Sequence, residues 1–78
     1  MSDLINNIDK LHTTSLGIIR IKRNLNIDGD VIDYCKKAIM NSKSNIYIKG
    51  KNYYCEIDNI RITINKKSYT VITAHIVI

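Results

Sequence analysis

The sequence contains no proline, no tryptophan and no phenylalanine, and five tyrosines are its only aromatic residues. Its core must therefore be built mainly from isoleucine. No proline, linker-like stretch or internal repeat divides the chain, so its 78 residues predict a single domain, residues 1–78. A domain of this size buries roughly 60% of its unfolded surface and has marginal stability. Because 45% of the residues are hydrophobic and none lie in a low-complexity run, a folded domain is expected.

The sequence also lacks the short patterns of several enzyme classes. It has no Walker loop, GxGxxG, HExxH, zinc-ligand spacing or nucleophile elbow, which argues against a nucleotide hydrolase, a dehydrogenase or a metalloenzyme; no cofactor and no metal site is expected. Cys35 and Cys55 form no CxxC pattern and are expected to be free, buried thiols rather than a disulfide. No apolar run approaches ~18 residues and no signal peptide is visible, so we expect a cytoplasmic protein without membrane contact.

The first positive feature is charge. Twelve Lys and Arg side chains against seven Asp and Glu give a net charge of +5. This balance favours RNA or another phosphate-bearing ligand as a partner, although the same charge also serves solubility alone. The heavy use of Ile, Asn and Lys is typical of AT-rich genes and loosely indicates a low-GC bacterium, its phages or its plasmids.

Apolar spacing predicts helices in the first half of the chain. Ser2 can cap a first helix, in which apolar residues recur at helical spacing over residues 4–11. Hydroxyl-bearing residues within 12–15 interrupt that pattern and supply caps for a second helix from Ser15 to Leu25. Aspartates in the loop 26–30 then predict the cap of a third helix.

Near residue 41 the apolar period changes from that of a helix to two. The rest of the chain predicts four short strands joined by tight turns at residues 50–51, 58–59 and 66–67. Residues 1–41 are thus expected to be mainly helical and residues 44–78 mainly β. The predicted fold class is α+β, with two to three N-terminal helices packed on one face of a four-stranded antiparallel meander. The other face of the sheet is then at least partly open.

The last strand carries the most informative pattern of the sequence. Within residues 68–78, Ile72, Ala74 and Ile76 fall on one side of an extended chain and are predicted to face the helices. The opposite side places a phenol, a hydroxyl and an imidazole in a row. Its members are Tyr69, Val71, Thr73, His75 and Val77.

Alternation along the other strands predicts which side chains share the open face with His75. A one-residue slip of the second strand would present Tyr53 and Cys55 there instead of its predicted members. Without that slip the set is Tyr47 and Lys49 from the first strand, Tyr54 and Glu56 from the second, and Arg61 and Thr63 from the third.

Such a set matches the needs of metal-free RNA cleavage. A base takes the proton of the ribose 2′-OH, an acid protonates the leaving 5′-oxygen, and cations stabilise the phosphorane. The tyrosines can stack on bases or simply cover the core. The candidates are His75 as the acid, Glu56 or His12 as the base, Thr73 beside them, Arg61 with Lys49 or Lys51 on the phosphate, and Tyr54 and Tyr69 as ligand contacts.

Each of these residues also has an ordinary structural explanation. The open-face set fits a solvated sheet surface that carries one histidine. His12 follows a predicted helix, where an imidazole interacts favourably with the C-terminal end of the helix dipole.

Three stretches resemble a family of short bacterial proteins of unknown function. They are HTTxLGxxRIxxNL at residues 12–25, GKNYY at residues 50–54 and SYTVITAH at residues 68–75. The resemblance spans nearly the whole chain and implies no activity.

A second resemblance concerns architecture. Helices followed by a four-stranded antiparallel sheet that ends in the strand 69–75 look like the barnase–EndoU–colicin–RelE group of toxin ribonucleases. That resemblance implies that Thr73 and His75 are active-face residues and that Arg61 and Lys51 bind phosphate. The chain is small for such an enzyme and lacks an obvious second catalytic histidine on the sheet.

Two functions remain open at this point. One is a small basic cytoplasmic protein that acts as a metal-independent, toxin-like endoribonuclease. The alternative is a non-catalytic phage or mobile-element protein that binds nucleic acid, a nucleotide signal or a host protein. In either case the short chain and its Ile-rich edges leave room for a homo-oligomer.

Overall fold

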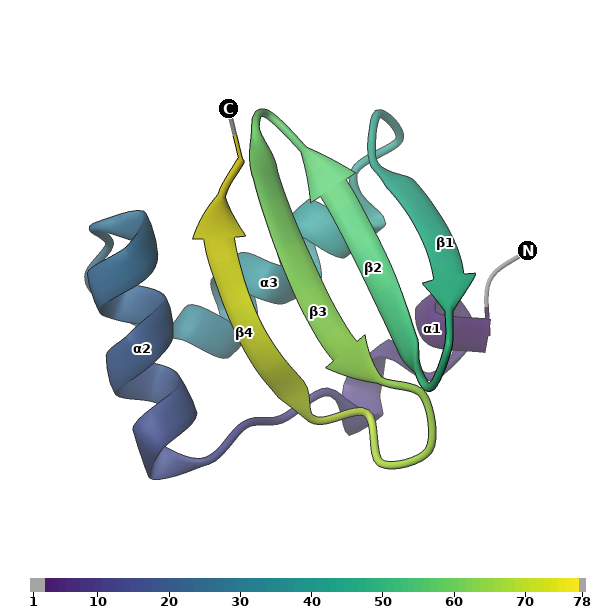
Figure 1. The fold of residues 1–78 in the computed structure, drawn as a ribbon, viewed down its shortest axis with the longest axis horizontal. Helices are drawn as coiled ribbons and strands as arrows, with labels where there is room; N and C mark the ends of the chain where they lie inside the picture. Colours follow the sequence, from purple (N-terminus) through teal and green to yellow (C-terminus); the bar gives the residue numbers. More distant parts are fainter. Residues whose placement is uncertain (1–2, 78) are drawn as a thin grey trace.

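The computed structural model describes residues 3–77, and its helices all precede its strands (Figure 1). This order confirms the α+β class. The helical elements are α1 (Asp3–Asn6), the short 3-10 helix η1 (Ile8–Lys10), α2 (Ser15–Leu25) and α3 (Val31–Met40). The strands are β1 (Asn45–Lys49), β2 (Asn52–Ile57), β3 (Ile60–Asn65) and β4 (Val71–Ile76). None of the helices within residues 3–77 has the length and apolar content needed to cross a membrane.

The predicted first helix is shorter than its apolar pattern suggested. The α-helical hydrogen bonding ends at Asn7, whose side-chain amide donates to the Asp3 carbonyl at 2.9 Å, and the chain continues as η1. An asparagine that bonds nearby backbone competes with helix continuation in this way. The proposed cap at Ser2 lies outside the described residues.

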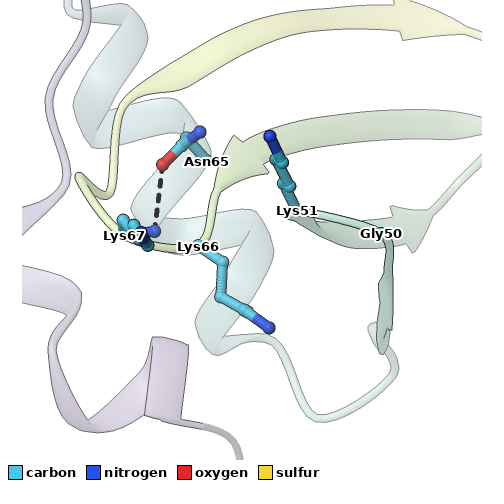
Figure 2. A pocket seen from close by; sticks show the side chains of 5 residues that line it. All are labelled: Gly50, Lys51, Asn65, Lys66 and Lys67. Atoms are coloured by element: carbon cyan, nitrogen blue, oxygen red, sulfur yellow. Dashed lines mark hydrogen bonds between the residues drawn. The ribbon is translucent and has the colours of Figure 1, made fainter.

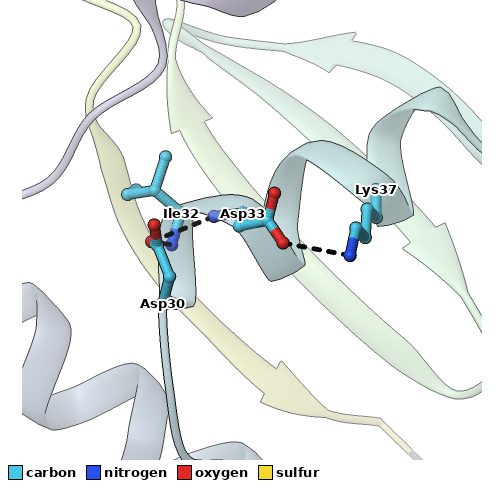
Figure 3. Close-up of polar contacts among 4 residues, drawn as sticks. All are labelled: Asp30, Ile32, Asp33 and Lys37. Atoms are coloured by element: carbon cyan, nitrogen blue, oxygen red, sulfur yellow. Dashed lines mark hydrogen bonds and ion pairs between the residues drawn. The ribbon is translucent and has the colours of Figure 1, made fainter.

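Side-chain caps start the two longer helices, as the sequence predicted. Thr14 accepts a hydrogen bond from the Gly17 N–H at 3.0 Å at the start of α2. At α3, Asp30 accepts from the N–H groups of Ile32 and Asp33 at 3.0 and 3.1 Å (Figure 3). Such a cap contributes ~1 kcal/mol to helix stability. The Asp33–Lys37 ion pair one turn later is solvent-exposed and adds little.

The four strands form one antiparallel sheet in the order β1-β2-β3-β4, so the predicted meander is correct. Figure 1 shows α1 and α3 behind this sheet and α2 alongside β4, which leaves the front face uncovered. The buried cluster lies between the helices and the back of the sheet. From the helical half it includes Leu4, Ile21, Val31, Cys35 and Ile39, and from the strands it includes Tyr53, Cys55, Ile62, Ile64, Val71 and Ala74.

The last strand departs from simple alternation at a β-bulge. Thr63 pairs with Thr73 but Ile64 pairs with Val71, so Ile72 is an extra residue without a partner on β3. The prediction that Ile72 faces the helices was therefore wrong: its side chain is 42% exposed, while Val71 is buried. An inserted residue reverses the facing of everything before it. Ala74 is in the core as predicted.

Ile76 shares the core side of the sheet with Ala74 but gains little burial there. It pairs with Ile60 at the end of β4 and remains 51% exposed. Strand ends extend beyond the helices that cover the centre of the sheet, so a core-facing position there need not be buried.

The outer edge of β4 is covered by residues from the helical half. The His12 N–H donates to the Tyr69 carbonyl at 3.2 Å, and the Val71 N–H donates to the His12 carbonyl at 2.7 Å. Next to this pair, the Thr13 hydroxyl donates to the Val71 carbonyl at 2.8 Å. Further along, the Asn24 amide of α2 donates to the Ala74 carbonyl at 3.2 Å. These contacts satisfy backbone groups that an edge strand otherwise presents to solvent.

The absence of a side chain at Gly17 leaves room for the Thr13 hydroxyl. A Cβ atom at position 17 would overlap the Thr13 Oγ1, so a larger residue would displace that hydroxyl from the Val71 carbonyl. The glycine is therefore required by close approach.

Replacing Thr13 with valine should lower the free energy of unfolding by ~1 kcal/mol, because it removes one hydrogen bond and keeps the shape of the side chain. Chemical denaturation measures this loss. The matched control is Thr13→Ser, which keeps the hydroxyl and should retain the part of the stability that comes from the bond. Equal stability of Thr13→Val and the parent would contradict this account of the edge.

Cys35 and Cys55 are free and fully buried, as the sequence predicted. Burial raises the pKa of the Cys35 thiol to about 12 and that of the Cys55 thiol to about 11. Since the thiolate is the reactive form, both groups should be inert in the folded protein.

We expect a thiol reagent to label neither cysteine quickly at pH 8 under native conditions, and to label both at once in denaturant. The native labelling rate should follow the population of the unfolded state. Fast labelling of the folded protein would show that one thiol is reached without unfolding.

Candidate functional site

Three ionisable side chains form a row across the open face of the sheet. Glu56 on β2 pairs with Arg61 on β3, and Arg61 pairs with His75 on β4. Tyr53 and Cys55, the alternate residues of β2, are buried in the core, which confirms the predicted face of the second strand. Paired strands lie ~4.8 Å apart, so Glu56 and His75 flank Arg61 with ~10 Å between their backbones.

Glu56 is held by two donors on a single oxygen. Its Oε2 accepts from the Tyr47 hydroxyl at 2.5 Å and from the Arg61 Nε at 2.8 Å. The Tyr47 hydrogen bond, and after it the Arg61 guanidinium, hold the pKa of Glu56 below its ordinary value. The same contact with Glu56 raises the pKa of Tyr47. Glu56 is therefore anionic at neutral pH and fixed in orientation.

The row keeps free hydrogen-bonding capacity for a ligand. Within residues 3–77, no group bonds to the Glu56 Oε1, and the His75 imidazole has no hydrogen-bonding partner. Arg61 donates to Glu56 through its Nε and also interacts with the nearby Tyr47 hydroxyl. Within residues 3–77 no acidic side chain other than Glu56 pairs with the guanidinium, so its terminal nitrogens can still approach an anion. The side chains of Arg61 and Glu56 are 37% and 32% exposed, so solvent and ligands reach them. A guanidinium suits bidentate recognition of phosphate.

Aromatic and hydroxyl side chains lie beside this row. Tyr47 and Tyr54 pair across β1 and β2, with ring centroids 5.4 Å apart and planes 17° from parallel. Thr63 and Thr73 pair next to them on β3 and β4. The Thr73 hydroxyl accepts from Asn24 at 3.4 Å and so retains its own proton for donation. Together these groups offer a stacking platform beside an anion site.

The other candidate base, His12, is at a different place. It pairs with Thr70, five residues before His75 along the chain, which puts the two histidines on the order of 15 Å apart. The His12 Nδ1 lies 2.9 Å from the Lys10 carbonyl and its Nε2 lies 3.0 Å from the Thr70 hydroxyl. The carbonyl must accept, so Nδ1 carries a proton. The structure therefore brings Glu56, and not His12, to the row that contains His75.

Tyr69 does not lie on the open face, contrary to the expectation from alternation. It precedes β4, has a positive φ of 58°, and packs against the core. Its ring stacks on Tyr53 with centroids 6.3 Å apart, and the Lys10 ammonium lies 5.9 Å from its centroid. The left-handed backbone at Tyr69 and the bulge after it both break the period of two.

Lys49 and Lys51 lie at the opposite end of the strands from Arg61. Lys49 pairs with Asn52, four residues before Glu56 on β2, which corresponds to ~13 Å. The sequence had suggested that one of these lysines binds the same phosphate as Arg61. Both lie too far from Arg61 to do so.

Lys51 instead lines a pocket with Lys66 and Lys67, which the sequence analysis assigned only to a tight turn. The pocket, of about 270 Å³, lies between the β1–β2 and β3–β4 turns and is lined by Gly50, Lys51, Asn65, Lys66 and Lys67 (Figure 2). The first and third turns of a meander lie at the same end of the sheet. Turn counting alone would have brought these lysines together.

Two further contributors were missed from sequence. Tyr47 was placed on the open face but not recognised as the donor that orients Glu56, because an alternating pattern shows a face and not a hydrogen bond. Asn24, which bonds Thr73, belongs to a helix about fifty residues away in the chain, and no local pattern links the two. Within residues 3–77, no three His, Cys, Asp or Glu side chains gather as metal ligands.

The chain belongs to a protein family described as "Protein of unknown function (DUF3781)", whose model matches residues 5–75. This agrees with the resemblance to a family of unknown function, and it assigns no activity. No curated protein and no solved structure matches the chain. The matched region contains the whole Glu56–Arg61–His75 row.

Replacing Tyr47 with phenylalanine should raise the pKa of Glu56 toward its ordinary value, because the variant removes the hydrogen bond that stabilises the carboxylate most. A carboxyl carbon NMR titration of Glu56 measures the change. Tyr54→Phe is the matched control, since no residue within 3–77 hydrogen-bonds the Tyr54 hydroxyl.

The folded protein should also respond to acid with a defined sign. A depressed pKa stabilises the fold above the unfolded value, and this stabilisation is lost as the pH falls through the folded pKa. As the pH falls from the unfolded-state pKa of Glu56 to its folded-state pKa, the free energy of unfolding should therefore decrease more in the parent than in Tyr47→Phe. An unchanged titration in Tyr47→Phe would mean that Arg61 alone sets the pKa of Glu56.

Proposed function

We propose that this member of the DUF3781 family is a metal-independent endoribonuclease whose reaction centre is the Glu56–Arg61–His75 row. The observation that carries the proposal is the pairing of these three residues on adjacent strands of an uncovered sheet face. A carboxylate and an imidazole on either side of a guanidinium supply a base, an acid and a phosphate ligand in one line.

The spacing suits an in-line displacement. Side chains stand roughly perpendicular to a sheet, so the ~10 Å between the backbones of the outer members carries over to their functional groups. This distance accommodates two hydrogen bonds of ~2.7 Å and leaves about 4.6 Å for the oxygen–phosphorus–oxygen axis. Glu56 Oε1 takes the proton of the ribose 2′-OH as that oxygen attacks phosphorus. The bond to the 5′-oxygen breaks, and protonated His75 gives that oxygen a proton. The products are a 2′,3′-cyclic phosphate and a free 5′-hydroxyl.

The neighbouring side chains have defined parts in this mechanism. Arg61 binds the nonbridging phosphate oxygens through its terminal nitrogens and balances the charge that develops on them. Tyr47 acts as a positioning residue, since it fixes the carboxylate through Oε2 and leaves Oε1 for the substrate. Thr73 donates its hydroxyl proton to the phosphate, and Tyr54 stacks on a base.

A second candidate function is favoured by one specific observation. The stacked Tyr47–Tyr54 pair beside a cationic side chain is sufficient to bind single-stranded nucleic acid without cleaving it. In a non-catalytic binding protein, the Glu56–Arg61 pair would only hold the surface rigid.

The deciding experiment measures cleavage of a fluorescent RNA in EDTA by the parent, Glu56→Gln and His75→Ala. Acid–base catalysis contributes ~10²–10⁴-fold, so each variant should lose cleavage by that order and still bind RNA. His12→Asn is the matched control because it alters the histidine outside the row. Circular dichroism confirms folding of each variant.

Three outcomes are distinct. Loss of cleavage in Glu56→Gln and His75→Ala with activity kept in His12→Asn supports the proposed centre. Binding of RNA by a parent that releases no cyclic phosphate supports the binding protein. Full cleavage by His75→Ala would exclude this residue as the acid.

A further inference from the structure

The pocket at the far end of the sheet contains a concentration of positive charge that the proposed reaction does not use. Its turns contribute Lys51, Lys66 and Lys67, and no acidic residue occurs in segments 49–52 and 65–69. Within residues 3–77, none of the three lysines forms an ion pair. Like charges gathered without a counterion repel one another, and an anion placed between them relieves that repulsion.

Hydrogen bonds within and between the two turns fix the backbone that carries these lysines. The Lys66 N–H donates to the Lys51 carbonyl at 2.9 Å, which ties the two turns together. Asn65 Oδ1 accepts from the N–H groups of Lys67 and Ser68 at 2.9 and 3.0 Å. The backbone that carries all three side chains is thus fixed, while the exposed side chains remain free to adjust.

The directions of the side chains indicate an extended ligand. Figure 2 shows Lys51 and Lys66 extending in opposite directions from their turns, so their ammonium groups do not converge on one point. A small anion would contact few of these groups. A chain with repeated charges contacts each as it passes.

The pocket and the reaction centre lie on one line along the strands. Three pairs of positions succeed one another on the open face: Asn52 with Asn65 beside the pocket, Tyr54 with Thr63, and Glu56 with Arg61. Four residues of extended strand separate the first pair from the last, or ~13 Å. Tyr54 occupies the position midway along this line.

We propose that the Lys51–Lys66–Lys67 pocket is a distal phosphate subsite, which binds the RNA backbone a few nucleotides from the phosphate held by Arg61. The subsite rests on the proposed function for the identity of its ligand. It predicts that long substrates gain affinity from the pocket and that dinucleotides do not.

The test uses a non-cleavable 2′-O-methyl octanucleotide and a 2′-O-methyl dinucleotide, with binding measured by fluorescence anisotropy over a range of salt concentrations. The variant is Lys66→Gln with Lys67→Gln. The matched control is Lys36→Gln with Lys37→Gln, an adjacent lysine pair on α3 behind the sheet. Loss of two phosphate contacts should weaken octanucleotide binding severalfold and make its salt slope shallower by ~1.4. Dinucleotide binding and both results for the control pair should match the parent.

The outcomes separate this subsite from the proposed reaction. Unchanged octanucleotide binding in the Lys66/Lys67 variant overturns the subsite, whether or not His75→Ala abolishes cleavage. Equal weakening by the two lysine pairs also overturns it, since net charge alone would then explain binding. Lysine-dependent binding by a parent that cleaves no RNA upholds the subsite and refutes the reaction. Equal affinity for polyglutamate with the same lysine dependence would reassign the pocket to an acidic protein, and absence of all binding would refute both proposals.

Discussion

The backbone pairing of His12 with the start of β4 holds the helical half and the β half of the chain together. Two hydrogen bonds, to Tyr69 and from Val71, join segments almost sixty residues apart. They direct the chain into α2 at a position where Ile21 and Leu25 reach the core. The cover over the back of the sheet, and hence the separation of a buried face from an open one, depends on this junction. Contacts of such high sequence separation form late and slow folding.

The open face can carry charged residues because Glu56 and Arg61 pair with each other while both side chains remain accessible to solvent. Glu56 has two donors, yet both use the same oxygen, so its charge is stabilised and its second oxygen stays available. Burial would have removed the solvent that a reaction or a ligand must reach, and full exposure would have left the carboxylate without orientation. A half-exposed cross-strand position on a rigid sheet gives both access and a fixed direction.

Local periodicity predicted the strands, the caps at Thr14 and Asp30, and the face of Glu56, Arg61 and His75, because each depends on neighbours a few residues away. It failed at Ile72 and Tyr69, where a bulge and a left-handed residue interrupt the alternation. Neither position carries a glycine or a proline that would have marked the break. It also left His12 beside Glu56 as an alternative base, because only tertiary structure shows that His12 pairs with Thr70. The lysine pocket arises from two turns, and a residue-by-residue interpretation treats each turn separately.

The two edges of the sheet differ, and this difference limits how copies of the chain can associate. The outer edge of β4 is occupied by His12, Thr13 and Asn24, whereas no residue within 3–77 pairs with the outer edge of β1. A sheet that is open on both sides can extend indefinitely into a fibre. One that is open on a single side can join only the same side of a second copy, and that union leaves no free edge. The closed edge therefore makes two the largest number of copies that strand pairing alone can assemble.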